Sequence, residues 1–180
     1  MIRRVVTLGG PPGSGKSTAG RLVAEALGLE LCSAGERFRA AARAHDLTLE
    51  AFGAYAQAHP EVDRELDRAM QALATPGRIL EGRIQGTLCR RAGTPVHAIV
   101  VTASEAERSR RVAGRDGLSV EAALQFVRER EASERWRYLA FYGIDLAHES
   151  SDLRIDSTDR SPPAVAESIV QFLQAAEAAA

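Results

Sequence analysis

The sequence predicts an α/β protein with one five-stranded parallel sheet and helices on both faces. Short β-rich runs alternate with longer segments of helical periodicity along the 180 residues, which is the pattern of strand–helix–strand units. The length suits one domain, so we expect residues 1–180 to form a single domain. Because parallel strands end along the same edge of a sheet, motifs that follow strands should meet there.

Five runs of β-branched and other apolar residues are predicted as strands, at residues 2–8, 29–32, 78–80, 96–101 and 153–156. Helical spacing predicts helices between them, at residues 14–27, 34–74, up to 91, 104–115, 119–142 and from 162 onward. Gly28 and the pair Asp116-Gly117 are signals that end helices. Breaks near residues 46–48 and 59–60 divide the long 34–74 segment.

The composition argues against several function classes. A net charge of −1 does not favour a nucleic-acid-binding surface, and no apolar run approaches the ~18 residues of a membrane span. The N-terminal apolar run is too short for a signal peptide. Cys32 and Cys89 lack metal-binding or redox spacing and are typical of a reducing compartment. We expect a cytoplasmic monomer without a nucleic-acid or membrane partner.

A phosphate-binding motif follows the first predicted strand and opens the first helix. The pattern GxxxxGK[ST] and its next residue comprise Gly10, Pro11, Pro12, Gly13, Ser14, Gly15, Lys16, Ser17 and Thr18. Glycines let backbone N–H groups turn toward phosphate oxygens, and the helix N-terminus favours an anion. Lys16 would reach the β- and γ-phosphates of ATP and the Ser17 hydroxyl would ligate Mg²⁺. The fold is therefore predicted as a three-layer P-loop NTPase fold; the alternative is a glycine-rich turn that matches by chance.

Lys16 is the only lysine in the chain, because the other 22 of the 23 basic residues are arginine. A guanidinium is a wide planar fork, whereas an ammonium is a compact point charge. A backbone loop wrapped around a phosphate has room for the ammonium, which explains why this position is not arginine. The alternative is that one lysine remains by chance.

Polar residues also follow the second and third predicted strands. Ser33 is placed to cap a helix that carries Gly35 and Arg39. The turn Glu81-Gly82-Arg83 follows the third strand, where Arg83 is suited to holding a phosphate in a bidentate fork. The alternatives are a capped surface helix with solvated arginines and a tight turn with a salt bridge.

Four arginines lie close together before Asp116-Gly117: Arg108, Arg110, Arg111 and Arg115. Such a cluster repels itself unless anions are present, so we predict an arginine-rich flap that closes over phosphates. The competing interpretation is a solvated helix face whose charge is offset by Glu105 and Glu107.

The helix predicted at 119–142 carries charged residues on its apolar face. Spacing predicts an apolar stripe of Val120, Leu124, Val127 and Tyr138. Glu131 and Glu134 continue that stripe, flanked by Arg130 and Arg137, and a carboxylate there is costly unless it is paired or lines a cleft. We therefore predict that Arg130, Glu134 and Arg137 face a site. The alternative is an Arg130–Glu134 surface pair. The charge run at 63–68 is expected to be mostly a solvated face, and its spacing alone does not predict a site.

Together these motifs resemble the cytidylate kinases, particularly the short archaeal-type branch of the nucleoside monophosphate kinases. The similar segments are GPPGSGKST (10–18), SAGERFR (33–39), PEVDRELDR (60–68), LEGRIQG (80–86), RVAGRDG (111–117), REASERWRY (130–138) and YGID (142–145). The resemblance implies a helical monophosphate-binding insert at about 35–75 and a short lid at about 107–118. It also implies transfer of the ATP γ-phosphoryl group to CMP or dCMP with Mg²⁺.

The resemblance also implies roles for individual residues. Ser33, Arg39 and Arg83, with Arg130, Glu134 and Arg137, would contact the acceptor nucleotide. Arg111 and Arg115 would be lid arginines that act in catalysis with Lys16 and Arg130, and Ser157 and Thr158 would border adenine. The chain departs from the family at Ile84, where long bacterial members have Asp, at Glu134 in place of Asp, and at Lys16, where many short members have Thr.

Three functions remain open from the residues alone. The first is a nucleoside monophosphate kinase, whose acceptor could be CMP, UMP or AMP. The second is a P-loop kinase for a small metabolite such as a sugar acid or shikimate. The third is an ATP-binding regulatory protein without turnover.

Overall fold

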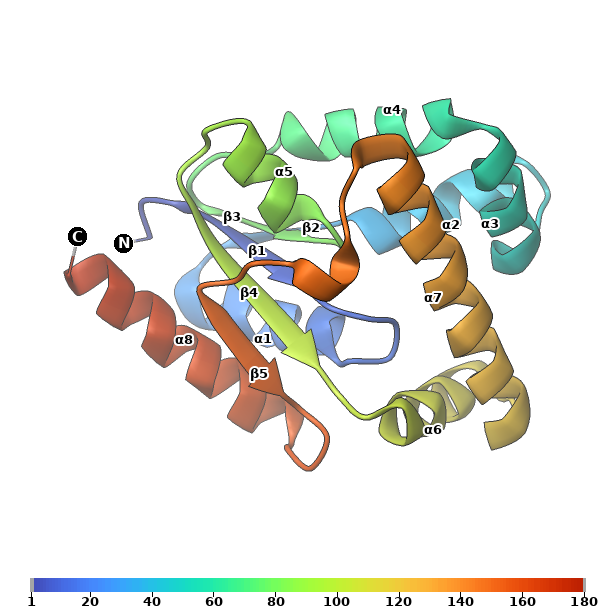
Figure 1. Cartoon of the computed structure of the whole chain (residues 1–180). Coiled ribbons are helices and arrows are strands. Elements are labelled where there is room, and N and C mark those ends of the chain that lie inside the picture. The colour runs from blue at the N-terminus through green and yellow to red at the C-terminus, as the bar shows by residue number, and fades with distance from the viewer. Residues whose placement is uncertain (1, 180) are drawn as a thin grey trace.

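A five-stranded parallel sheet, covered by helices on both faces, forms the centre of the computed structural model, which describes residues 2–179 (Figure 1). The strands are β1 (Val5–Gly9), β2 (Glu30–Ser33), β3 (Arg78–Glu81), β4 (Val96–Thr102) and β5 (Leu153–Asp156). Their order in the sheet is β2-β3-β1-β4-β5, and every neighbouring pair is parallel. This confirms the predicted fold class. The successive strands β3 and β4 lie on opposite sides of β1, so the topological switch point, where α/β sheets bind ligands, lies beside that strand.

The helices follow the predicted pattern. They are α1 (Lys16–Leu27), α2 (Ala34–Ala44), α3 (Leu49–Ala58), α4 (Pro60–Gln71), α5 (Gln85–Arg91), α6 (Glu105–Asp116), α7 (Val120–Tyr142) and α8 (Pro162–Ala178), with a 3₁₀ turn at Leu146–His148. The predicted 34–74 segment is three helices, separated at the two expected breaks. In the part of the chain that the structure describes, no helix is both long and apolar enough to cross a bilayer.

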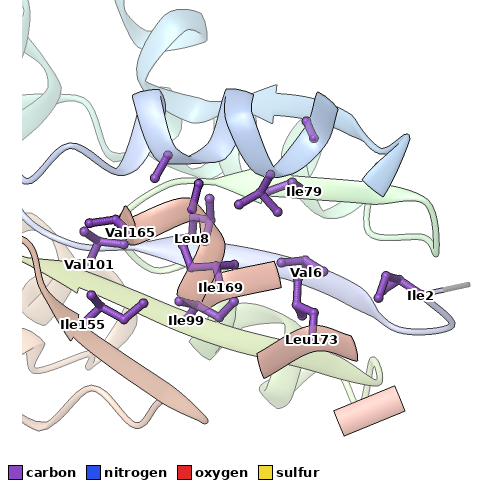
Figure 2. Close-up of a cluster of buried hydrophobic side chains, with 14 residues drawn as sticks. Ile2, Val6, Leu8, Ile79, Ile99, Val101, Ile155, Val165, Ile169 and Leu173 are labelled. Atoms are coloured by element: carbon purple, nitrogen blue, oxygen red, sulfur yellow. The ribbon is translucent and has the colours of Figure 1, made fainter. Parts of the chain in front are cut away.

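The sheet buries a separate apolar cluster on each face. Val6 and Leu8 of β1 pack with α1 and α8 in the larger cluster, in which Ile169 and Leu173 of α8 are fully buried (Figure 2). Val5 points to the other face, in a cluster with residues of α4 and α5. Alternation along β1 therefore anchors both layers to one central strand, and the carboxyl end of that strand is fixed in place for the loop that follows.

A buried polar network connects α4 to α5 and α7. The carboxylate of Asp67 accepts hydrogen bonds from Gln85 Nε2 of α5 at 2.8 Å and from the Tyr142 hydroxyl of α7 at 2.7 Å. Gln71 Nε2 in turn donates to Gln85 Oε1 at 2.8 Å. Each polar group is satisfied by a neighbour, so the network joins three helices without the cost of an unpaired buried group.

The prediction that the charge run 63–68 is a solvated face is therefore wrong for two of its members. Asp63 and Asp67 are 3% and 6% exposed, while Arg64, Glu65 and Arg68 are exposed. The two aspartates lie four residues apart and so share one face of α4. That face meets α5 and α7, where polar partners replace water.

The network makes stability depend on pH in a direction set by Asp67. Burial raises the pKa of Asp67 from 3.8 to about 6. The folded state therefore holds a proton that the unfolded chain releases, and the stability this contributes is present below pH 4 and lost as pH rises through about 6. The loss is on the order of 3 kcal/mol for a shift of about two units.

We predict that the wild-type protein loses stability between about pH 4 and pH 7 relative to Asp67→Asn, which does not titrate. The free energy of unfolding of both proteins, measured by urea denaturation at the two pH values, provides the check. Parallel changes in the two proteins would contradict the assignment.

Candidate active site

A cavity of about 1300 Å³ lies over the carboxyl ends of the strands. Its walls come from the loop between β1 and α1, the turn after β3, the helices α2 to α4, and the facing sides of α6 and α7. Figure 1 shows α7 running from the level of α4 to α6 across this end of the molecule. Segments far apart in sequence therefore enclose one space, somewhat larger than the roughly 300–1,000 Å³ of a pocket for one small molecule.

The loop between β1 and α1 requires glycine at specific positions. Gly10, Gly13 and Gly15 have φ angles of 134°, 78° and 84°, a region that side chains rarely adopt. A Cβ atom on Gly10 would lie 2.0 Å from the Val101 carbonyl oxygen, and one on Gly13 would lie 2.7 Å from the Arg108 carbonyl oxygen. The motif thus has the structural context that distinguishes a phosphate-binding loop from a chance match, namely a strand before it and a helix after it.

Glu81, at the end of β3, joins the ends of three elements. Its carboxylate accepts a hydrogen bond from Ser17 Oγ at 3.0 Å and another from Ser33 Oγ, and it lies 3.7 Å from Lys16 Nζ. Lys16 Nζ also donates to the Pro11 carbonyl at 3.3 Å. Burial lowers the pKa of Lys16, while the charge of Glu81 acts in the opposite direction. Glu81 therefore contacts residues of the phosphate-binding loop as well as Ser33, which was predicted to contact the acceptor.

Three charged residues of the predicted sites meet at the middle of α7. Glu134 is 6% exposed, accepts from Arg130 Nε at 2.9 Å, and lies 3.7 Å from Arg83 Nε. Burial opposes ionisation of Glu134, but the charges of Arg130, Arg83 and Lys16 hold its pKa below the ordinary value. The pair Arg130–Glu134 is therefore not a solvated surface pair, since it lines the cavity with Arg83.

The predicted apolar stripe of α7 is only partly right. Val120 is 50% exposed, and the buried positions are Ala123, Val127, Glu134 and Arg137. Glu131, which neighbours Val127 and Glu134 on the helix, is half-buried and forms a 3.0 Å ion pair with Arg108 of α6. The reason is that α6 packs along the first half of α7 while the second half faces the cavity, so one stripe does not describe the whole helix.

Arg137 forms a buried ion pair that the sequence did not predict. Its Nη1 donates to both carboxylate oxygens of Asp63, and both residues are nearly inaccessible to solvent. The guanidinium carbon lies 5.2 Å from the ring centre of Phe38 and 5.7 Å from that of Tyr138. Burial raises the pKa of Asp63, and Arg137 counteracts this. The spacing of Asp63 and Asp67 on one helix face was the available signal.

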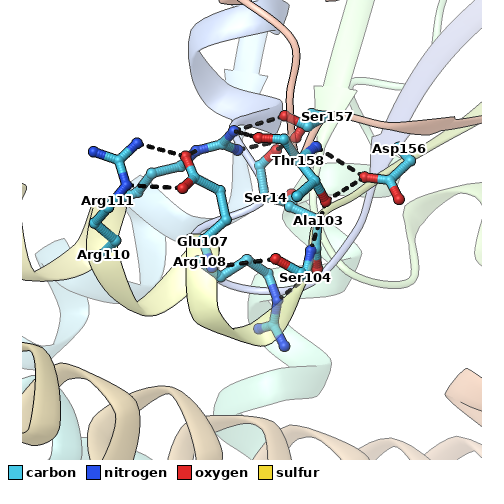
Figure 3. Close-up of polar contacts among 10 residues, drawn as sticks. All are labelled: Ser14, Ala103, Ser104, Glu107, Arg108, Arg110, Arg111, Asp156, Ser157 and Thr158. Atoms are coloured by element: carbon cyan, nitrogen blue, oxygen red, sulfur yellow. Dashed lines mark hydrogen bonds and ion pairs between the residues drawn. The ribbon is translucent and has the colours of Figure 1, made fainter.

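Arg111 connects α6 to the phosphate-binding loop through Ser157 (Figure 3). Its Nη1 donates to Ser157 Oγ at 2.9 Å, and that hydroxyl donates to the Ser14 carbonyl at 2.8 Å. Its Nε also pairs with Glu107 at 2.7 Å. Arg115 pairs with Asp116 at 2.6 Å at the end of the helix. Both arginines line the cavity.

Arg108 is buried and donates hydrogen bonds to neighbouring backbone carbonyls, so it does not belong to the predicted flap. It is 6% exposed, and its Nη1 donates to the Pro12 carbonyl at 3.1 Å, while its Nε donates to the Ala103 carbonyl at 3.1 Å. The four arginines therefore do not form one mobile cluster, since Arg108 supports the loop from behind and Arg110 pairs with Glu107 on the surface.

Most residues predicted for the site line the cavity: Gly10, Pro12, Gly13, Ser14, Gly15, Lys16, Ser17, Thr18, Gly35, Arg39, Glu81, Gly82, Arg83, Arg111, Arg115, Arg130, Glu134, Arg137 and Ser157. Pro11, Ser33 and Thr158 stand behind this lining, where Thr158 Oγ1 accepts from the Ser104 backbone and Ser33 contacts Glu81. Sequence reasoning missed further lining residues: Phe38, Gln57, Asp63, Asp67, Gln85 and Ser133. Their residue types are ordinary, so only the fold brings them together.

Solved structures share the fold of this chain. A shikimate kinase from Acinetobacter baumannii matches with a TM-score of 0.62 and 20% identity over 96% of this chain and 94% of its own. A gluconokinase from Sinorhizobium meliloti matches with a TM-score of 0.60 and 17% identity over 96% and 93%. At these identities the likeness concerns the fold alone.

Sequence relatives define the family. Residues 6–137 match a family described as "AAA domain". A cytidylate kinase from Pyrococcus horikoshii is 40% identical over 163 residues, which cover 89% of this chain and 83% of the relative. A cytidylate kinase from Archaeoglobus fulgidus is 36% identical over 172 residues, which cover 94% of each. With a phosphate-binding loop at one end of its cavity and charged helix faces at the other, the chain belongs to the cytidylate kinase family.

Proposed function

We propose that this protein transfers the γ-phosphoryl group of ATP to CMP or dCMP, giving ADP and CDP or dCDP. The observation that carries the proposal is the meeting of Lys16, Arg83 and Arg130 around the buried Glu134, from three separate elements. Phosphoryl transfer needs in-line positioning and neutralisation of charge more than covalent chemistry by the protein. The three cations, which come from separate elements, can position the reacting phosphates and neutralise their charge.

The donor nucleotide is proposed to bind along the loop at 10–18. The backbone N–H groups and Lys16 would hold its β- and γ-phosphates, while Ser157 would border adenine with Thr158 behind it. Arg111 and Arg115, in a lid at about 107–118, would approach the transferring group. The hydrogen bonds from Arg111 to Ser157, and from Ser157 to the Ser14 carbonyl, support this placement because they put a cation beside the loop.

The residues near Lys16 fit Mg²⁺. The Ser17 hydroxyl and the Glu81 carboxylate are adjacent hard oxygen donors, and Mg²⁺ is usually held by one or two protein groups together with substrate phosphates. In the described residues no group of three or more His, Cys, Asp or Glu side chains could hold a metal alone, so the phosphates would complete the shell. Mg²⁺ would neutralise charge on the transferring phosphates.

The acceptor phosphate is proposed to lie between three arginines from different elements. Arg39 belongs to the proposed monophosphate-binding insert at about 35–75, Arg83 follows β3, and Arg130 is on α7. Arg39 and Arg130 both line the cavity, and burial, and next the charge of Arg130, lowers the pKa of Arg39. An anion between them would relieve this repulsion. The attacking oxygen belongs to a phosphate that is already ionised, so the step requires no general base.

The first prediction concerns the acceptor. In an assay that couples ADP release to NADH oxidation, ADP should appear with CMP and dCMP in preference to UMP, AMP, shikimate and gluconate. A higher rate with a metabolite would identify another acceptor, and ADP release without any acceptor would indicate an ATPase.

The second prediction concerns Lys16. Lys16→Met should abolish turnover, because the β- and γ-phosphates lose the one ammonium that lies within the loop. Arg135→Met is the matched control, since Arg135 is exposed and outside the cavity. Steady-state rates of both variants with CMP give the comparison, and a Lys16→Met enzyme that keeps most of its rate would disprove the mechanism.

The third prediction concerns Arg83. Arg83→Ala should raise the KM for CMP by roughly 10- to 100-fold, the cost of losing a hydrogen-bonded charged partner, and leave the KM for ATP nearly unchanged. Arg135→Ala serves as the control. If the effect appeared only in the KM for ATP, the assignment of Arg83 to the acceptor would be wrong.

A further inference from the structure

Two buried donors beyond the phosphate-binding residues lack partners in the described structure. They are Arg137 Nε and Ser133 Oγ, both on α7 and both on residues that line the cavity. A buried polar group without a hydrogen bond is costly, so it usually signals a missing partner. Arg137 is only 4% exposed, and its hydrogen bonds use Nη1 alone, toward Asp63.

The position of Arg137 along α7 separates its guanidinium from Arg130, whereas Ser133 lies between the two. Arg130 and Glu134 lie near Lys16 and Arg83. Arg137 is seven residues beyond Arg130, which is about 10 Å along the axis of an α-helix. An acceptor nucleotide whose phosphate lies at Arg130 would therefore extend its base toward Arg137. This step rests on the function proposed above.

The chemistry at this end of the cavity suits a flat ring with a polar edge. Phe38 and Leu66 line it with apolar surface, and Gly53 of α3 faces Ser133, whose Oγ would lie 3.8 Å from a Cβ atom at that glycine. The rings of Phe38 and Tyr138 lie against the Arg137 guanidinium, which restrains its orientation. Asp63 adds an acceptor beside the donors of Arg137, so a donor and an acceptor are presented next to each other.

We propose that Asp63 and Arg137 together recognise the base of the acceptor nucleotide, and that Asp63 selects cytosine over uracil. Cytosine carries an amino group at C4, which can donate to the carboxylate, and has acceptors at N3 and O2 for the guanidinium. Uracil reverses the first two groups, with an oxygen at C4 and an N–H at N3. It would place an acceptor against the carboxylate and a donor against the guanidinium.

Adenine also has an amino group next to a ring acceptor, but its next ring position carries C–H where cytosine has O2. The guanidinium fork would therefore lose one of its two acceptors with adenine. A site built to hydrogen-bond a particular edge rejects analogues that leave its buried groups unpaired. Asp67 is the other carboxylate on this face of α4; its hydrogen bonds come from Gln85 and Tyr142, whereas Asp63 is the one paired with Arg137.

The test is the ratio of the CMP and UMP dissociation constants, measured by calorimetry on the full-length protein without turnover. Wild type should bind CMP more tightly than UMP. Asp63→Asn should reduce that preference by roughly 10-fold or more, the size of discrimination by one well-formed base contact, because an amide can donate to the C4 oxygen of uracil. Glu65→Gln, on the exposed side of the same helix, should keep the wild-type ratio.

Equal weakening of CMP and UMP binding by Asp63→Asn would overturn the proposal, since a purely structural role of Asp63 affects both ligands alike. Wild-type protein that binds neither nucleotide, or has no preference between them, would overturn it too. Binding of CMP with the expected ratios, but without phosphoryl transfer from ATP, would support the base contact while disproving the proposed kinase activity.

Asp63→Asn leaves Arg137 buried without its counter-ion, which can prevent folding. Thermal melting and ATP binding report whether the variant is folded. If it is not, Asp63→Asn combined with Arg137→Gln removes both charges, and the same loss of the CMP preference is expected. A double variant that keeps the wild-type ratio would overturn the proposal.

Discussion

The close approach of four cations in one partly dry cavity is the constraint on which the rest of this structure depends. Lys16, Arg39, Arg83 and Arg130 line one cavity, and within residues 2–179 their ion pairs are with Glu81 and Glu134 alone. Bringing such cations together is costly in a low dielectric. The rigid sheet ends, the hydrogen-bonded carboxylates and the packed helices hold these cations in place. An anion that binds among them would reduce their mutual repulsion.

The sequence predicted the parts of the fold that depend on local signals. The strands follow from β-branched runs, and the loop at 10–18 follows from a motif whose glycines have no substitute at their φ angles. Helix starts such as Ser33 and Ser119 follow from side chains that cap the backbone. Each of these depends on a few neighbouring residues, which is why a single sequence was enough.

The errors occurred where a helix has more than one neighbour. α7 contacts α6 along its first half and faces α3 and the cavity along its second, so its buried side shifts and Val120 becomes exposed. Asp63 and Asp67 look solvated in a run of charges because their partners, Arg137, Gln85 and Tyr142, come from other elements. Burial of a charge is decided by long-range contacts that local periodicity does not record.

Arg108 has a mechanical consequence for the chain around the cavity. Its hydrogen bond to the Pro12 carbonyl joins α6 to the nucleotide-binding loop, and its bond to the Ala103 carbonyl holds the start of the helix. Arg111 makes a second connection to the loop through Ser157. These hydrogen bonds tie the first two turns of α6 to the nucleotide-binding loop. In the lid proposed at about 107–118, movement would therefore be confined to the part of α6 beyond Arg111, around Arg115 and Gly117.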